Sequence, residues 1–309
     1  MSRRGWLLFS AMCVIWGIPY LLIKVAVREL SPVTLVFARC TIAVVLLLPV
    51  TLARGELRPV LRYWKPLLAF TAAEVAIPWL LLSVAEQRLT SSLTGLLVAA
   101  VPLVGVGIAF ARGATAGIGL TRIAGLLVGI AGVAALVGVD VRGAQLGAAL
   151  AVAVVVVGYA VGPVVLTKYL AQLPPLGVIT VSLSVVAIGY APFALTDLPH
   201  KWPSASVTEA AIVLGTVCTA LAFLLFFALI AEVGPVEATV ITYVNPAVAV
   251  LLGAIFLHEH ITLWTLLGFA LILGGSFLAT RATVARSPSP MNSVIPALTA
   301  PDGENGRAG

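Results

Sequence analysis

The sequence predicts an all-α polytopic membrane protein with ten transmembrane helices, arranged as two inverted repeats of five helices. Three observations predict this class. Charged residues make up 10% of the 309-residue chain and hydrophobic residues 61%, whereas about 25% of a soluble globular protein is charged. The apolar residues gather in runs of about 20, the length of a membrane-spanning helix. The two halves of the chain also match each other at a fixed offset.

The same composition excludes other classes. One core could not bury this much apolar surface, and a disordered chain would not contain it. The sequence lacks the alternating ten-residue segments of a lipid-facing β-barrel. Cys13, Cys40 and Cys218 all fall inside apolar runs, so we interpret them as small core residues and not as a disulfide framework.

Ten apolar runs stand out in a window of about 19 residues. They are 5–27, 32–53, 67–86, 90–111, 122–139, 145–168, 175–196, 207–231, 235–257 and 262–280. The first run follows Ser2-Arg3-Arg4 as in a signal sequence, but it is too long and lacks a small-residue cleavage site, so we expect a retained span. Short connectors, Ala85 to Leu89 and Glu232 to Pro235, predict tight helical hairpins.

The positions of lysine and arginine predict the orientation. Most of the 18 basic residues fall in loops that are cytoplasmic if the amino end is inside, and such residues resist translocation. We therefore expect a multi-pass protein of the cell (inner, cytoplasmic) membrane with both termini in the cytoplasm. Residues 282–309 are rich in Pro, Ser, Gly and Asn and predict a disordered cytoplasmic tail.

An internal repeat appears when the chain is aligned with itself. Three pairs share an offset of 144 residues: Pro19 with Pro163, Lys24 with Lys168, and Pro102 with Pro246. An offset of 143 aligns Gly125 and Gly132 with Gly268 and Gly275. A repeat of five spans is odd, so its second copy enters the membrane from the opposite side, as in many secondary transporters. The repeats are predicted at 5–140 and 145–281.

Two stretches carry a family resemblance. Trp16-Gly17-Ile18-Pro19-Tyr20 with Lys24, followed by Pro32 and Arg39, resembles the start of an EamA domain of the drug/metabolite transporter superfamily. The segment from Gly234-Pro235 through Val244-Asn245-Pro246 to His258-Glu259-His260 is similar to the close of the second such domain. The first copy departs from this pattern, because Arg112-Gly113-Ala114-Thr115 replaces the acidic turn. The resemblance implies ten helices in two repeats and a cavity lined by the first four helices of each.

Basic residues inside or near the spans are candidates for substrate binding. Arg39 lies about seven residues into its span, roughly 10 Å from the boundary, where a charge needs a partner or a wet cavity. It could bind an anionic substrate group, or it could lock two helices together by binding backbone carbonyls. Lys24 could join Arg39 near the outer mouth, and Lys168 could be a cation at the inner mouth. Both lysines could equally be interface anchors.

Glu74 is the acidic residue well inside a span. A carboxyl at this depth could bind and release a proton during transport, which makes Glu74 the candidate for proton coupling. The structural alternative is a carboxyl that is hydrogen-bonded to Thr71 or Ser83 or paired with a basic group.

Aromatic and amide side chains near prolines are further candidates. A proline inside a helix frees a carbonyl and bends the axis, and in a membrane such a break persists where a cavity or neighbour satisfies it. Pro19, Pro102, Pro163 and Pro246 are therefore predicted hinges. The predicted substrate contacts near them are Trp16, Tyr20, Trp79, Tyr159, Tyr243 and Asn245. The alternative is that tyrosine and tryptophan anchor the helices at the interface.

Glycine and histidine patterns have simpler interpretations. The pairs Gly125 with Gly129 and Gly158 with Gly162 are small-residue faces; a dimer seam at the fifth and tenth helices is possible, and packing within the chain is favoured. His258-Glu259-His260 does not have the spacing of a helical ligand pair, so we expect no metal site.

These observations predict a secondary transporter, an exporter of small metabolites such as amino acids or related organic compounds, that works by alternating access and could be proton-coupled. A multidrug or cation efflux carrier is the alternative, and a membrane-embedded enzyme a weaker one, because the spans lack clustered catalytic groups. The expected partners are a small-molecule substrate, the lipid bilayer and possibly a second copy of the chain, with no nucleic acid and no cofactor.

Overall fold

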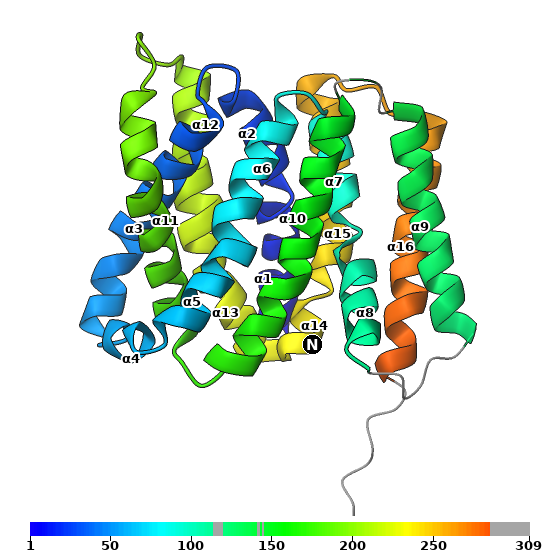
Figure 1. The fold of residues 1–309 in the computed structure, drawn as a ribbon, viewed down its shortest axis with the longest axis horizontal. Helices are drawn as coiled ribbons and strands as arrows, with labels where there is room; N and C mark the ends of the chain where they lie inside the picture. Colours follow the sequence, from blue (N-terminus) through cyan, green and yellow to red (C-terminus); the bar gives the residue numbers. More distant parts are fainter. Residues whose placement is uncertain (114–119, 141–142, 144, 285–309) are drawn as a thin grey trace, which may run out of the picture.

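The computed structural model describes residues 1–113, 120–140, 143 and 145–284. In this part of the chain the secondary structure is helical throughout, without strands, and the helices stand side by side as a bundle (Figure 1). The predicted tail falls outside it from residue 285 onward, whereas residues 282–284 still belong to the last helix.

Nine helical segments of the described residues are long and apolar enough to cross a membrane, and Ile241–Leu257 is a shorter apolar helix. The first half contains α1 Arg3–Ile15, α2 Ile18–Ala26, α3 Pro32–Ala53, α4 Leu57–Leu61, α5 Trp64–Thr71, η1 Ala72–Ala76, α6 Ile77–Glu86, α7 Ser91–Val98, α8 Val101–Ala111 and α9 Leu120–Asp140. The second half contains α10 Gln145–Val165, η2 Leu166–Leu170, α11 Pro175–Thr196, α12 Ala205–Gly215, η3 Thr216–Leu221, α13 Ala222–Val233, α14 Pro235–Ala238, α15 Ile241–Leu257 and α16 Leu263–Val284. Together they form the ten predicted spans.

Local sequence determines where several helices begin. The Ser31 hydroxyl accepts a hydrogen bond from the Thr34 amide at the start of α3, and the Thr90 hydroxyl accepts one from the Leu93 amide at the start of α7. Pro32 follows Ser31 in the first turn, where its missing N–H is no loss. These caps satisfy amide groups that the helix itself cannot bond.

Each span of the first half packs against a span of the second. In the first span, α1 packs against α13 and α2 against α12. The other pairs are α3 with α11, α5 to α6 with α10, α7 with α15, and α9 with α16. The α9 and α16 pair stands at one edge of the bundle in Figure 1. The other eight spans form a closed ring, since α11 also contacts α5, α10 contacts α7, α15 contacts α2, and α12 contacts α3.

The repeat extends to the backbone. Pro32 and Pro175 open α3 and α11, and Pro49 and Pro192 lie inside these helices, each pair 143 residues apart. The third and eighth spans both contain a π-helical turn, η1 from Ala72 and η3 from Thr216, which begin 144 residues apart. Such turns occur often at functional sites. The two inverted five-helix repeats are thus matched in helix starts, prolines and irregular turns.

Glycines join α9 to α16 in a symmetric seam. A Cβ added at Gly125 would lie 2.8 Å from the Gly275 carbonyl oxygen, and one added at Gly132 would lie 2.9 Å from the Gly268 carbonyl oxygen. At the offset of 143, Gly125 corresponds to Gly268 and Gly132 to Gly275, so the two contacts are equivalent under the repeat. These glycines therefore allow close helix approach within the chain, which confirms the favoured interpretation of the Gly125 face.

Polar contacts join the two halves at both ends of the bundle. In the connection after α2, which lies at the top of Figure 1, the Glu29 carboxylate accepts hydrogen bonds from the hydroxyl and the amide of Ser204, each 2.7 Å. These bonds hold the pKa of Glu29 below its ordinary value. At the lower end, the Ser2 hydroxyl donates to Glu232, which also pairs with Arg4 at 3.8 Å. The connection between α1 and α13 is thus polar at its exposed end and apolar within the bundle.

We predict that Gly132→Ala destabilises the bundle. The new methyl group would meet the backbone of Ile272 and Gly268, which cannot move without separating α9 from α16, and overpacking of this kind costs about 1–3 kcal/mol. Thermal unfolding of the purified protein in detergent measures the loss. Gly274→Ala is the matched control, because a Cβ there meets nothing within 4 Å. Equal unfolding temperatures for the two variants would contradict the seam.

Candidate functional site

Arg39 lies at the centre of the polar residues inside the ring. It comes from α3, is 7% exposed, and its Nε donates to the Thr219 hydroxyl at 2.8 Å. Its Cζ lies 3.7 Å from the centroid of the Trp79 ring, a cation–π contact. Thr219 belongs to η3 and donates in turn to the Leu214 carbonyl. The ion pairs found in the described residues do not include Arg39.

Two tyrosines complete the surroundings of this arginine. Trp79 is hydrogen-bonded through its side chain to Tyr159 of α10, and both Tyr159 and Tyr20 of α2 lie near Arg39. We call Arg39, Trp79, Tyr159, Thr219 and Tyr20 the Arg39 cluster. Its members come from spans that are not all neighbours in the ring, so they meet inside it.

Glu74 lies beside this cluster on the π-helical turn η1. Its side chain packs against Gly162 of α10, and its Oε2 is buried with no hydrogen-bond partner among the described residues. Thr71 and Ser83 do not hold it, because Thr71 donates to Ser182 and Ser83 donates to the Trp79 carbonyl. Tyr159 is the member of the Arg39 cluster that lies near Glu74.

Lys24 occupies a different place from Arg39. Its Nζ donates to the backbone carbonyls of Glu86 at 2.6 Å and Leu89 at 2.7 Å, and so caps the end of α6. Its repeat mate Lys168 is exposed on η2, with Nζ 4.9 Å from the centroid of the Tyr169 ring. Lys24 thus binds a helix end, and Lys168 lies at the surface beside an aromatic ring.

The other predicted contact residues pack helices together. Trp16 lies in the break between α1 and α2, with its ring 5.9 Å from Phe223 and 4.7 Å from Phe226. With its amide nitrogen facing the two carbonyls, Asn245 donates to Ile241 and to Cys13. The Tyr243 hydroxyl pairs with Thr280 of α16. These contacts of Trp16, Asn245 and Tyr243 do not include the Arg39 cluster.

The predicted hinge prolines differ in their local setting. Pro19 and Pro102 lie in the first turns of α2 and α8, directly after breaks in the first and fourth spans. Pro163 lies inside α10, shortly before the π-helical turn η2. Pro246 lies inside the continuous helix α15. Three of the four are thus next to an irregular segment of backbone.

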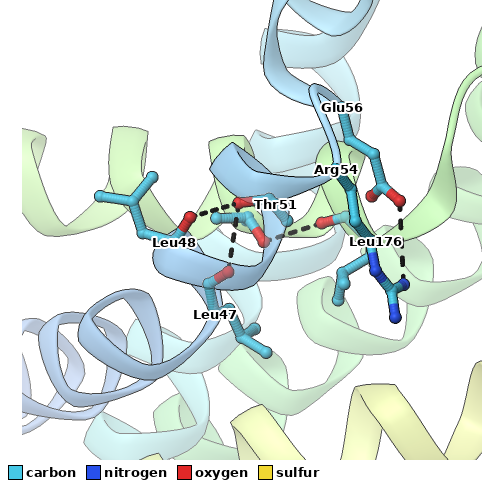
Figure 2. Close-up of polar contacts among 7 residues, drawn as sticks. Leu47, Leu48, Thr51, Arg54, Glu56 and Leu176 are labelled. Carbon is cyan, nitrogen blue, oxygen red and sulfur yellow. Dashed lines mark hydrogen bonds and ion pairs between the residues drawn. The ribbon is translucent and has the colours of Figure 1, made fainter.

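A pocket of about 270 Å³ lies where the end of α3 meets α13 and the start of α11. It is lined by Arg54, Glu56, Pro175, Leu176, Leu224, Phe227 and Ala228. Figure 2 shows its polar wall, where Arg54 pairs with Glu56 at 3.8 Å, beside the Thr51 hydroxyl, which donates to the carbonyls of Leu47 and Leu48. The rings of Phe223 and Phe227 stack at 6.1 Å, so aromatic residues of α13 extend from this pocket toward Trp16.

Three residues of this interior were missed by sequence reasoning. Thr219 carries no sequence signal, since a threonine inside an apolar span is common. Glu86 reads as part of a connector because Gln87 and Arg88 follow it, but it ends α6 and is 0% exposed. Glu259 was noted only as part of an acidic turn; its carboxylate accepts hydrogen bonds from the amides of Ser91 and Ser92 and caps α7.

Comparisons with known proteins agree with this architecture. The family model of the EamA-like transporter family matches twice, at residues 3–138 and 146–281. The chain is 30% identical over 256 residues to the uncharacterized inner membrane transporter YedA of Escherichia coli (strain K12), over 79% of each chain, and equally to YedA of strain O157:H7. A solved crystal structure, 22% identical, covers 91% of this chain and 98% of its own with a TM-score of 0.64, which shows the fold.

The fold and the family matches define a polytopic membrane transporter built from two repeats. The chain belongs to the EamA-like transporter family, as the resemblance in its first and ninth spans indicated.

We predict a graded response to alanine at three glycines of α10. Gly158→Ala should destabilise most, by about 1–3 kcal/mol, because its Cβ would meet the rigid Ala73 carbonyl oxygen at 2.5 Å. Gly162→Ala should cost less, since its Cβ would meet the Glu74 carboxylate, which can move. Gly147→Ala, with open space around it, is the control.

The double variant Gly162→Ala with Glu74→Ala separates packing from other causes. If the Glu74 carboxylate occupies the space, Glu74→Ala removes the penalty of Gly162→Ala in thermal unfolding. Additive losses in the two variants would show that Glu74 does not pack there.

Proposed function

We propose that this protein is a secondary transporter that exports small metabolites, such as amino acids or related organic compounds, by alternating access of its two repeats. The observation that carries the proposal is Arg39, a buried guanidinium between the repeats that has no carboxylate partner among the described residues. Substrates of repeat-built transporters bind near the midplane at the repeat interface.

Arg39 would bind an anionic group of the substrate. Its hydrogen bond to Thr219 uses Nε, and a guanidinium has further N–H donors in a planar fork that suits a carboxylate. The Trp79 ring lies against one face of the guanidinium and thereby orients that fork. Tyr159 and Tyr20 would supply hydroxyl and ring contacts to the rest of the substrate.

Alternating access would use the irregular segments of the helices. The π-helical turns η1 and η3 lie at matching positions of the repeats, and each contains a residue of the interior, Glu74 in η1 and Thr219 in η3. The prolines next to the breaks, Pro19 and Pro102, and Pro163 before η2 would act as hinges, with Pro246 bending α15. A rocking motion of one repeat against the other fits this pattern.

Proton coupling through Glu74 is part of the same proposal. An unpartnered carboxyl in a membrane is expensive as a charge and therefore favours exchange between a protonated and a charged form as its surroundings open. Glu74 lies on η1, which packs against the α10 helix that carries Tyr159, so it is placed to respond to substrate at the Arg39 cluster.

The proposed setting is the inner membrane, by analogy with the relative YedA, with both termini in the cytoplasm and a small solute and lipids as partners. A homodimer would need a face other than the α9 and α16 seam, which is used within the chain. A multidrug or cation efflux carrier is the second candidate, favoured by the aromatic rings and the carboxyl of Glu74.

Substitution of Arg39 tests the substrate class. We expect purified protein in liposomes to exchange a labelled carboxylate in counterflow, and Arg39→Met to raise its half-saturation concentration about ten- to a hundredfold, the worth of a charge-assisted hydrogen bond of about 1.5–3 kcal/mol. Arg39→Lys should recover only part, because it lacks the fork. Arg88→Met, at an exposed arginine, is the control. Unchanged saturation in Arg39→Met would exclude this role.

Substitution of Glu74 tests coupling. Glu74→Gln keeps the shape but cannot release a proton, so we expect counterflow at equal pH to persist while an imposed pH gradient no longer accelerates net transport. Transport rates with and without the gradient, in the same liposomes, measure this. A gradient response equal to that of the unsubstituted protein would exclude Glu74 as the coupling group.

A further inference from the structure

Glu86 is a buried carboxyl that the proposed transport mechanism does not use. It is the last residue of α6, the helix that ends at the top of the bundle in Figure 1. Glu86 is 0% exposed, and neither carboxyl oxygen has a hydrogen-bond partner among the described residues. A carboxylate in an apolar environment needs donors to be stable. The absence of donors around both oxygens distinguishes Glu86 from a structural cap.

Glu259 shows what a structural cap looks like in the same region. Its carboxylate accepts hydrogen bonds from the Ser91 amide at 2.7 Å, the Ser92 amide at 2.9 Å and the Ser92 hydroxyl at 2.5 Å. A helix N-terminus and three donors stabilise its negative charge. Glu86 interacts electrostatically with Glu259 but has none of these donors itself.

The charges around Glu86 already balance without it. The charged groups near Glu86 are Lys24 on α2 and Glu259 after α15, and Tyr20 on α2 is also nearby. Arg28 lies near Lys24 and is exposed. The Lys24 ammonium binds two carbonyls, one of them the Glu86 carbonyl itself, and no ion pair joins it to the carboxyl in the described part of the chain. When Lys24 and Glu259 are both charged, the three residues Lys24, Glu259 and Glu86 have no net charge if Glu86 carries a proton.

The elements packed against α6 carry the other titratable groups around Glu86. Tyr20 and Lys24 lie on α2, Arg39 and Cys40 on α3, Glu74 on η1 and Tyr159 on α10. Among the described residues, both carboxyl oxygens of Glu86 are buried without a hydrogen-bond partner, and one oxygen of Glu74 is. The ion pairs of the described part of the chain include neither carboxyl.

We propose that Glu86 is a second proton-binding site, at the end of α6, that takes up and releases a proton during the transport cycle. This inference rests on the proposed function, namely proton-coupled transport. Glu86 is protonated in the arrangement described here, in which Lys24 caps α6, and it releases the proton when this end of the bundle opens and water reaches the carboxyl. The proton moves only between the carboxyl oxygen and water, so the step needs no other reactant.

Two measurements test this site. The first is the infrared carbonyl stretch of protonated carboxyl groups, recorded as a function of pH in the reconstituted protein. We expect a band that titrates in the unsubstituted protein and is missing in Glu86→Gln. Glu209→Gln, at an exposed glutamate of α12, is the control and should keep the band. A spectrum of Glu86→Gln equal to that of the control overturns the proposal, whatever the transport assay gives.

The second measurement is transport driven by a pH gradient. We expect Glu86→Gln to keep counterflow at equal pH and to lose acceleration by the gradient, and Glu86→Asp, which retains a carboxyl, to restore part of it. If the gradient drives transport in the unsubstituted protein but not in Glu74→Gln, and Glu86→Gln responds normally, Glu86 has no such role while the proposed function stands. If the gradient has no effect on the unsubstituted protein, proton coupling itself is wrong and the role of Glu86 in it is overturned.

Discussion

The dependence of each repeat on the other is the constraint from which the rest of this structure follows. Five helices of one repeat do not form a closed bundle, because their main contacts are with the opposite repeat: α3 with α11, α7 with α15, and α9 with α16. The interior is therefore an interface between two inverted units. Any residue placed there, such as Arg39, responds to the relative position of the two repeats.

Polar groups are used sparingly within that interface. Thr219 accepts from Arg39 and donates to Leu214, Asn245 binds two carbonyls, and Lys24 binds two more. Each of these pairings removes the cost of an unsatisfied group in an apolar medium. Glu74 and Glu86 are exceptions, with buried oxygens that have no hydrogen-bond partner among the described residues. A buried polar group without a hydrogen-bond partner is rare in native proteins and often has a functional role.

Much of the fold follows from the sequence because the membrane imposes simple rules. Apolar run length determines the spans, and the confirmed family membership agrees with the motifs around Trp16 and Pro246. The glycines that align at an offset of 143 became a contact seam, since close helix approach requires small residues at matching depths. The roles of Lys24, Tyr243 and Asn245 could not be predicted, because which neighbour a side chain meets depends on how the helices are paired.

The sequence by itself determined that the chain spans a membrane in ten helices, that its halves repeat, and that Arg39 and Glu74 are unusual, since hydropathy and charge are properties of position along the chain. Only the tertiary structure decided that Thr219 and Trp79 hold Arg39, that Lys24 caps α6, and that Glu86 is buried. These residues are separated by long stretches of sequence and become neighbours only when the two repeats pack together.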